Sequence, residues 1–157
     1  MKTSKWTVLL FLMPLFLLSA CVEKPIDVKP RTLTLPISNL WQCHNDAKWD
    51  STKIVDKLVG QWKWRYTTAG SEPNFVDSTQ NLGLVIDFKT NGILNVLKND
   101  TLIQTATWKV KKNFDIYFSV QTQPQIYDLK GVILFCNEYV VFNESHKDAY
   151  DSYFKRK

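Results

Sequence analysis

The sequence predicts an all-β fold, an eight-stranded antiparallel up-and-down barrel preceded by one short N-terminal helix. Apolar and polar residues alternate along most of residues 61–156, and turn residues interrupt the alternation at intervals of about 8 to 12 residues. No long helical period breaks this pattern. Because a closed sheet leaves no strand edge exposed, we expect these strands to close into a barrel.

The composition fits one globular domain with short appendages. The chain has 157 residues, of which 45% are hydrophobic and 22% are charged. These values exclude a collagen-like, low-complexity or wholly disordered chain. The length leaves room for a single core, since domains have about 100 to 200 residues.

Residues 1–20 have the layout of a secretory signal peptide. Lys2 and Lys5 stand before an apolar run that extends from Thr7 to Leu18. This run is too short to cross a bilayer as a helix, which needs roughly 20 apolar residues. We therefore expect a signal that is removed and not a membrane span.

The end of this segment, residues 18–21 with the sequence Leu-Ser-Ala-Cys, resembles the lipobox of bacterial lipoproteins. The resemblance implies that Cys21 is acylated, with palmitate or a similar chain, and becomes the new amino terminus of a membrane-anchored lipoprotein. Two or three acyl chains are enough for stable anchoring. Val22, in place of the Asp that resembles an inner-membrane retention signal, favours the outer membrane, and the lack of an acidic run after Cys21 favours its periplasmic face. An ordinary signal peptide, with Cys21 merely near the cleavage site, remains the alternative.

Residues 21–49 are expected to carry the lipid anchor and an extended linker. Pro25, Pro30 and Pro36 favour a stiff path, and no sustained period is present. Loss of Lys2 and Lys5 leaves 18 basic and 15 acidic residues, a formal charge of +3. The basic residues are scattered, so we expect no nucleic acid partner. The run at 155–157 is more typical of a solvated strand end than of a polyanion or lipid-headgroup patch.

Two cysteines remain when Cys21 is acylated. Cys43 and Cys136 form an even pair in an oxidising compartment, where disulfides persist. A bond between them would close a loop of about 90 residues and stabilise the fold by roughly 4 to 5 kcal/mol in the chain-entropy model. Two separate buried thiols are the alternative.

The barrel domain is expected over residues 50–157, and its elements follow in order. Asp50 or Ser51 can cap a short helix that stops at Gly60. The first strand then begins with aromatic residues at Trp62, Trp64 and Tyr66, on one parity. The later strands are expected at 82–88, 94–96, 101–110, 114–118, 126–135, 139–142 and 150–156. Their turns are expected at Asn91-Gly92, at 99–100, at Lys111-Lys112-Asn113 and at 137–138, with a break at Pro124.

Gly60-Gln61-Trp62, which opens the first strand after a short helix, resembles the Gly-x-Trp signature of the lipocalins and of small bacterial lipocalin-like lipoproteins. The last strand, at residues 153–156, and the hairpin at residues 87–92 are also similar to those relatives. The resemblance covers about residues 50–156. It implies that Arg156 stacks on Trp62 and closes the barrel, a cation–π pair of about 0.5 to 2 kcal/mol.

The interior of an eight-stranded barrel is just wide enough for side chains or for one small ligand. Large side chains on the inward parity compete for that space, so a filled core and a pocket are both open. If there is a pocket, the candidate ligand-binding wall residues are Trp64, Tyr66, Phe88, Trp108 and Phe118.

Residue clusters typical of enzymes and metal sites are missing from the sequence. His44 and His146 are solitary, and there is no Cys-x-x-Cys, Gly-x-Ser-x-Gly or phosphate-cradling glycine loop. We therefore expect no catalytic residues, metal or cofactor. Trp41 and Trp49 flank the linker, and packing over the barrel mouth is favoured over recognition of a partner or sugar.

These observations lead to two hypotheses. The first is a lipid-anchored envelope lipoprotein whose lipocalin-like barrel binds a small apolar or amphipathic ligand. The second is a noncatalytic module with a filled barrel that acts as a structural element or docks another protein. An internal cavity of about 300 Å³ or more would favour the first.

Overall fold

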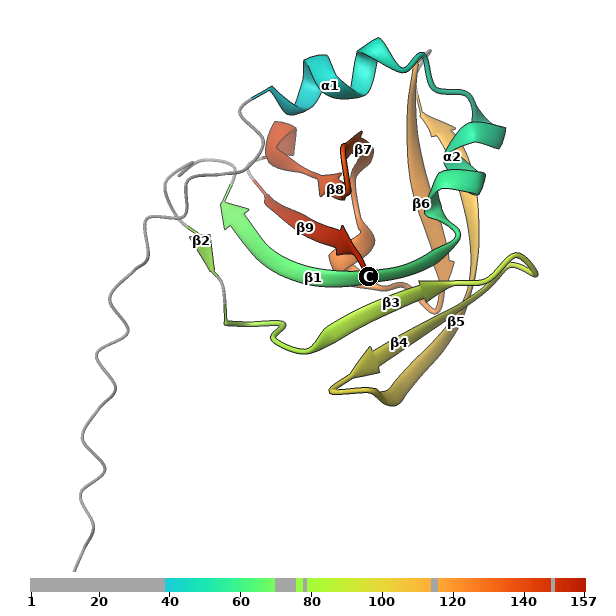
Figure 1. The fold of residues 1–157 in the computed structure, drawn as a ribbon, viewed down its shortest axis with the longest axis vertical. Helices are drawn as coiled ribbons and strands as arrows, with labels where there is room; N and C mark the ends of the chain where they lie inside the picture. The colour runs from blue at the N-terminus through green and yellow to red at the C-terminus, as the bar shows by residue number, and fades with distance from the viewer. Residues whose placement is uncertain (1–38, 70–75, 78, 114–115, 148) are drawn as a thin grey trace, which may run out of the picture. The chain divides into compact units, whose positions relative to one another are not determined.

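The structure, a computed structural model, describes residues 39–157 with the exception of 70–75, 78, 114–115 and 148 (Figure 1). The expected signal peptide, the expected lipidation site at Cys21 and most of the expected linker lie outside the described residues. So does Phe114, which was expected to open a strand.

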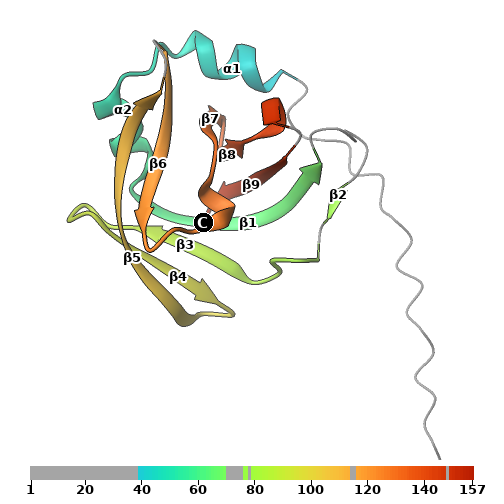
Figure 2. The same ribbon diagram turned by 180° about the vertical axis from the view of Figure 1, so that it is seen from behind.

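The fold is all-β, with eight antiparallel strands in one nearly closed barrel. Along the sheet the strands follow the order β6 (Tyr117–Gln123), β5 (Thr101–Asn113), β4 (Ile93–Lys98), β3 (Leu84–Phe88), β1 (Gly60–Ala69), β9 (Tyr150–Arg156), β8 (Tyr139–Asn143) and β7 (Val132–Cys136). β1 and β9, the first and last strands along the chain, are therefore neighbours in the sheet, as Figures 1 and 2 show. A ninth, short strand, β2 (Val76–Asp77), pairs with the end of β1. The order ends at β6 and β7, which leaves one unpaired seam in the barrel.

Three of the turns that join consecutive strands lie where the sequence predicts them. Gly92 has a positive φ of 77° in the turn between β3 and β4. Asn99 and Asp100 have φ values of 50° and 62° between β4 and β5, and Asn137 has a φ of 53° between β7 and β8. Glycine, Asn and Asp adopt this left-handed region at the lowest cost, which explains their positions.

Several expected strand boundaries and one expected turn are wrong. Lys111, Lys112 and Asn113 do not form a turn, because β5 continues through them and pairs with β6 as far as Tyr117. Ile116, which was expected within a strand over 114–118, lies outside β6 with 61% of its surface exposed. The strand expected over 126–135 begins instead at Val132, after a short 3₁₀ helix, η1 (Tyr127–Leu129). A second 3₁₀ turn, η2 (Ser145–Lys147), lies between β8 and β9.

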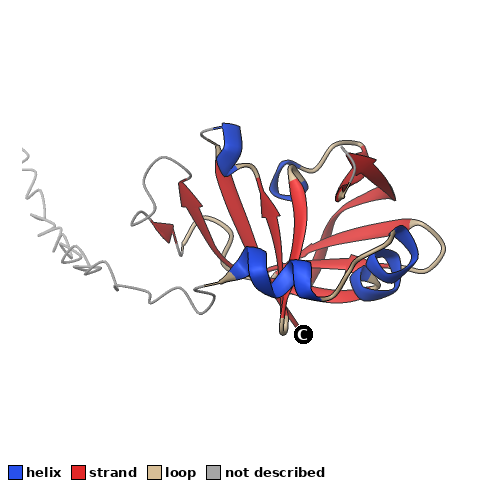
Figure 3. Ribbon diagram, turned by 90° about the horizontal axis from the view of Figure 1, so that it is seen from above, coloured by secondary structure: helices blue, strands red, loops and turns tan. Residues whose placement is uncertain are grey.

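Among the described residues two α helices precede β1, and not one. The expected helix is α2 (Ser51–Leu58), whose N-cap Asp50 accepts a hydrogen bond from the backbone N–H of Lys53 at 2.9 Å. The unexpected helix is α1 (Leu40–Asp46), which lies within the range assigned to the linker. In Figure 3 the strands, in red, form the body of the domain, and the helices, in blue, lie around it.

The buried apolar side chains form two clusters. The larger one fills the barrel and contains Trp62, Trp64, Phe88 and Phe154 with their neighbours from the other strands and from α2. The smaller one lies on the other face of β7, β8 and β9, where Leu134, Val141 and Tyr153 pack beside Leu40 of α1. The strands of this part of the sheet are therefore apolar on both faces.

Candidate functional site

The predicted wall residues do not face one shared pocket. Trp64, Phe88, Trp108 and Phe118 belong to the barrel core, with exposed fractions of 2%, 1%, 8% and 5%. The rings of Phe88 and Trp108 meet edge to face at 4.9 Å, a favourable aromatic geometry. Trp64 donates through Nε1 to Oγ1 of Thr67 at 3.2 Å, and Trp108 donates through Nε1 to the carbonyl of Lys89 at 3.1 Å. The indole N–H groups of Trp64 and Trp108 are thus hydrogen-bonded within the protein, and their rings pack in its core.

Tyr66 is not a wall residue, because a β-bulge changes the side of the sheet to which it points. The register of β1 with β9 shifts between Trp64, which pairs with Phe154, and Tyr66, which pairs with Tyr153. An inserted residue reverses the parity of every residue after it. Tyr66 therefore lies in the smaller cluster and stacks on Tyr153 with ring centroids 4.4 Å apart. Its burial raises the pKa of its hydroxyl.

Arg156 connects the last strand to the first strand and to the end of α2. Its guanidinium lies 4.1 Å from the ring centroid of Trp62 and donates to the carbonyls of Val59, at 2.6 Å, and Lys57. These carbonyls belong to the C-terminal end of α2, where a cation is favoured by the helix dipole. Trp62 itself donates through Nε1 to the carbonyl of Leu58 at 2.6 Å.

The unpaired seam between β6 and β7 is the feature that distinguishes this barrel from a fully closed one. β6 pairs with β5 alone and β7 with β8 alone among the described strands. Free backbone groups on strand edges favour pairing with another chain, so natural proteins usually cover or protect them. We call the region between these two strands the seam.

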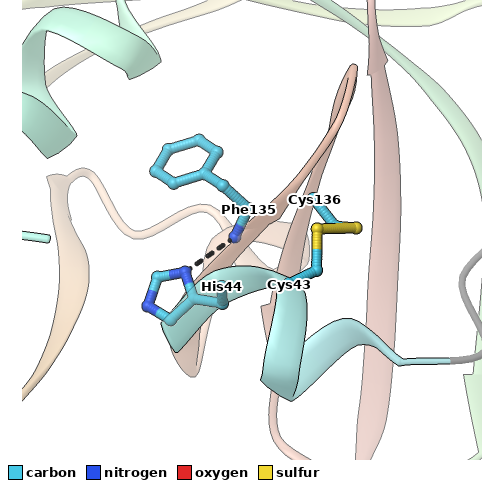
Figure 4. Close-up of a disulfide and its surroundings, with 4 residues drawn as sticks. All are labelled: Cys43, His44, Phe135 and Cys136. Atoms are coloured by element: carbon cyan, nitrogen blue, oxygen red, sulfur yellow. Dashed lines mark hydrogen bonds between the residues drawn. A yellow bond between two sulfur atoms is a disulfide. The ribbon is translucent and has the colours of Figure 1, made fainter. Parts of the chain in front are cut away.

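Helix α1 covers one end of the seam. A disulfide joins Cys43 of α1 to Cys136 at the end of β7, across a separation of 93 residues, as the sequence predicts (Figure 4). On the other strand, Trp41 of α1 meets Tyr117 at the start of β6, edge to face at 5.5 Å. Helix α1 therefore contacts both β6 and β7, the two strands that border the seam.

His44 completes this cover by accepting a hydrogen bond from β7. The backbone N–H of Phe135 donates to Nδ1 of His44 at 3.0 Å (Figure 4). The ring is buried, with 3% exposed, and stacks on Trp49 at 5.7 Å, and Trp49 in turn packs on Phe135. Burial lowers the pKa of His44 from 6.5 to about 4. The imidazole is therefore neutral at pH 7, and because Nδ1 accepts the Phe135 N–H its proton lies on Nε2.

The other end of the seam is open and basic. A groove of about 880 Å³ runs beside β6 and the start of β7. Among the described residues, one carboxylate, Glu144, and several neutral polar side chains line it together with four lysines, Lys111, Lys112, Lys130 and Lys147. Glu144 already lies 3.8 Å from Lys147, and the ammonium of Lys130 lies 4.0 Å from the ring centroid of Tyr127. The groove therefore carries an excess of positive charge in a concave surface, where a field is strengthened. We call it the seam groove.

Sequence reasoning missed this groove because its lysines come from three segments separated by up to 36 residues. The signal that could have located α1 is the helical spacing of Leu40, Cys43 and His44, which places all three on one face. Within the described ranges, no three His, Cys, Asp or Glu side chains gather in a way that could hold a metal ion. None of the helices in this part of the chain is long and apolar enough to cross a membrane.

Comparisons of the chain with family models, with curated proteins and with solved structures gave no match. The function of the chain is therefore inferred from the geometry of the barrel and its seam.

Proposed function

We propose that this chain is a lipid-anchored envelope lipoprotein with a lipocalin-like barrel that is filled, and that it works as a noncatalytic protein-interaction module. The observation that supports the filled barrel is the packing of Trp64, Phe88, Trp108 and Phe118, each at most 8% exposed and in one core. A cup for a small apolar ligand needs wall residues that border a common cavity. The rings of Phe88 and Trp108 contact each other instead, and all four side chains belong to one core cluster.

The proposed anchor is the acylated Cys21, and the proposed location is the periplasmic face of the outer membrane. Metabolic labelling with palmitate tests the anchor. We expect label in the wild-type protein and none in Cys21→Ser. Equal label in both would contradict it.

The filled barrel is tested by the stability of two alanine variants. Phe88→Ala removes a ring with 1% exposure from the core, so we expect a loss of about 3 to 5 kcal/mol in the free energy of unfolding. The matched control is Leu82→Ala, which alters a side chain with 59% exposure and should change stability by about 0.5 kcal/mol or less.

The rival hypothesis, a ligand-binding cup, predicts different results in the same samples. The Phe88→Ala variant would lose little free energy of unfolding, and native mass spectrometry of the purified wild type would show a retained small molecule. Repeated spectra without a ligand, together with a large loss for Phe88→Ala, support the filled module.

A further inference from the structure

The open end of the seam combines two features that together fit one kind of ligand. The first feature is backbone: β6 has one edge that no described strand pairs with, and Ser119, Val120 and Gln121 of this strand line the seam groove. An exposed strand edge can accept an extended peptide through main-chain hydrogen bonds. This feature selects a polypeptide over a ligand without backbone amides.

The second feature is charge. Lys111 and Lys112 come from β5, Lys130 from the segment before β7, and Lys147 from η2 after β8. They converge on one groove although they are far apart in the sequence, and Glu144, the one carboxylate among the described lining residues, is already paired with Lys147. Neutral side chains of the lining, Gln121 and Gln125 among them, add hydrogen-bond donors. This charge selects an acidic ligand.

The cover at the other end gives the groove a defined limit. Trp41 lies against Tyr117, the first residue of β6, and His44 accepts a hydrogen bond from the backbone N–H of Phe135 in β7. A peptide would therefore have free edge available from about Ser119 onward, and not along the whole of β6. Alternate residues of an added strand point to the same face, about 6.8 Å apart, so acidic residues at every second position would face the lysines together.

We propose that the seam groove binds an extended acidic segment of a partner protein, which pairs as an additional strand with the free edge of β6. This inference rests on the proposed interaction function and identifies its site and the chemistry of its partner. The lysines select the segment by charge, and the edge of β6 holds its backbone.

The test uses the full chain as the cell processes it, purified in a nonionic detergent. The probe is a fluorescent eight-residue peptide of alternating Thr and Glu, and binding is measured by fluorescence anisotropy. We expect saturable binding that weakens with added salt, and at least tenfold weaker binding of the matched peptide of alternating Thr and Gln.

Two variants locate the site. Replacing Lys111, Lys130 and Lys147 together with Gln should weaken binding of the acidic peptide about tenfold, since each exposed ion pair contributes only modestly to affinity. The control replaces Lys63, Arg65 and Lys98, basic residues that do not line the groove, with Gln and should change the affinity by about twofold or less. Equal losses in the two variants would overturn the proposal, because they would show attraction to net charge alone.

Two further measurements test the strand pairing and the class of partner. An acidic peptide with N-methyl groups on alternate amides should lose binding, since it cannot complete the ladder; retained binding would refute strand addition. Binding of vesicles containing phosphatidylglycerol that depends on the three groove lysines, without binding of the acidic peptide, would assign the groove to lipid headgroups and refute a peptide partner. The stability of Phe88→Ala and the native mass spectra do not depend on peptide binding. Refutation of peptide binding in the seam groove is therefore distinguishable from refutation of the filled barrel.

Discussion

The neutral state of His44 predicts a loss of stability as the pH falls. Its pKa is lowered to about 4 in the folded protein by burial, whereas an unfolded chain has the ordinary value of 6.5. Between these values the unfolded state takes up a proton that the folded state does not. The contribution of His44 is therefore complete above pH 6.5, and it decreases as the pH falls towards 4 by about 1.4 kcal/mol for each pH unit, roughly 3 kcal/mol in total.

The physical reason is visible in the contact with β7. Nδ1 of His44 accepts the N–H of Phe135, so a proton on Nδ1 would replace an acceptor by a second donor. It would also place a charge in a ring that is 3% exposed and stacked on Trp49. Protonation of His44 therefore destabilises the folded seam.

The assay is urea unfolding of the disulfide-bonded protein at pH 7.5, 6.5, 5.5 and 4.5, for the wild type and for His44→Gln. The Gln amide oxygen can accept a hydrogen bond but does not titrate. Asp128 and Asp151, whose pKa values burial raises, respond to pH in both proteins and cancel in the difference. We expect the wild type to lose about 2 to 3 kcal/mol more than the variant across this range. Parallel curves for the two proteins would refute the role assigned to His44.

Three further predictions concern the closure of the barrel. Gly60→Ala should destabilise by more than about 1 kcal/mol and lower the Tm, because Gly60 has a φ of 116° and an added Cβ would lie 2.6 Å from the Arg156 guanidinium; an unchanged Tm would contradict this. Arg156→Lys should lose at least one of the two carbonyl hydrogen bonds and lower the free energy of unfolding by about 1 to 3 kcal/mol, with a change in the Trp62 fluorescence; a neutral effect would show that any cation suffices. Replacing Cys43 and Cys136 together with Ala should cost about 2 to 5 kcal/mol, measured against wild type under oxidising conditions, and a reducing agent should destabilise the wild type alone.

The sequence predicts the strands and most of the turns because local signals determine them. The alternation after Gln61 reflects the two faces of a pleated strand, and the Asn91-Gly92 turn needs a positive φ that Gly92 has. Asp50 caps α2 as expected, because the capping bond to Lys53 joins residues three apart. The disulfide is predictable from the number of cysteines and the expected compartment, without any knowledge of the fold.

What the sequence does not predict depends on tertiary contacts. Helix α1 has seven residues, too few for stability in isolation, and is held by Cys43 and His44 against β7. The side to which Tyr66 points depends on a bulge for which the sequence has no glycine or other evident signal. The extension of β5 through Lys112 depends on its pairing with β6, which overrides the polar character of the segment.

The position of the lysines favours recognition over simple protection of the seam. Charges that protect an edge strand usually lie on that strand, where they oppose pairing with another chain. None of the four lysines of the seam groove lies on β6 or β7; they belong to β5, to the segment before β7 and to η2. The edge of β6 itself presents Ser119 and Gln121, which do not repel an added strand. Charge that surrounds an uncharged edge admits an acidic segment and excludes a basic one, whereas the end at α1 is closed by a disulfide and by His44.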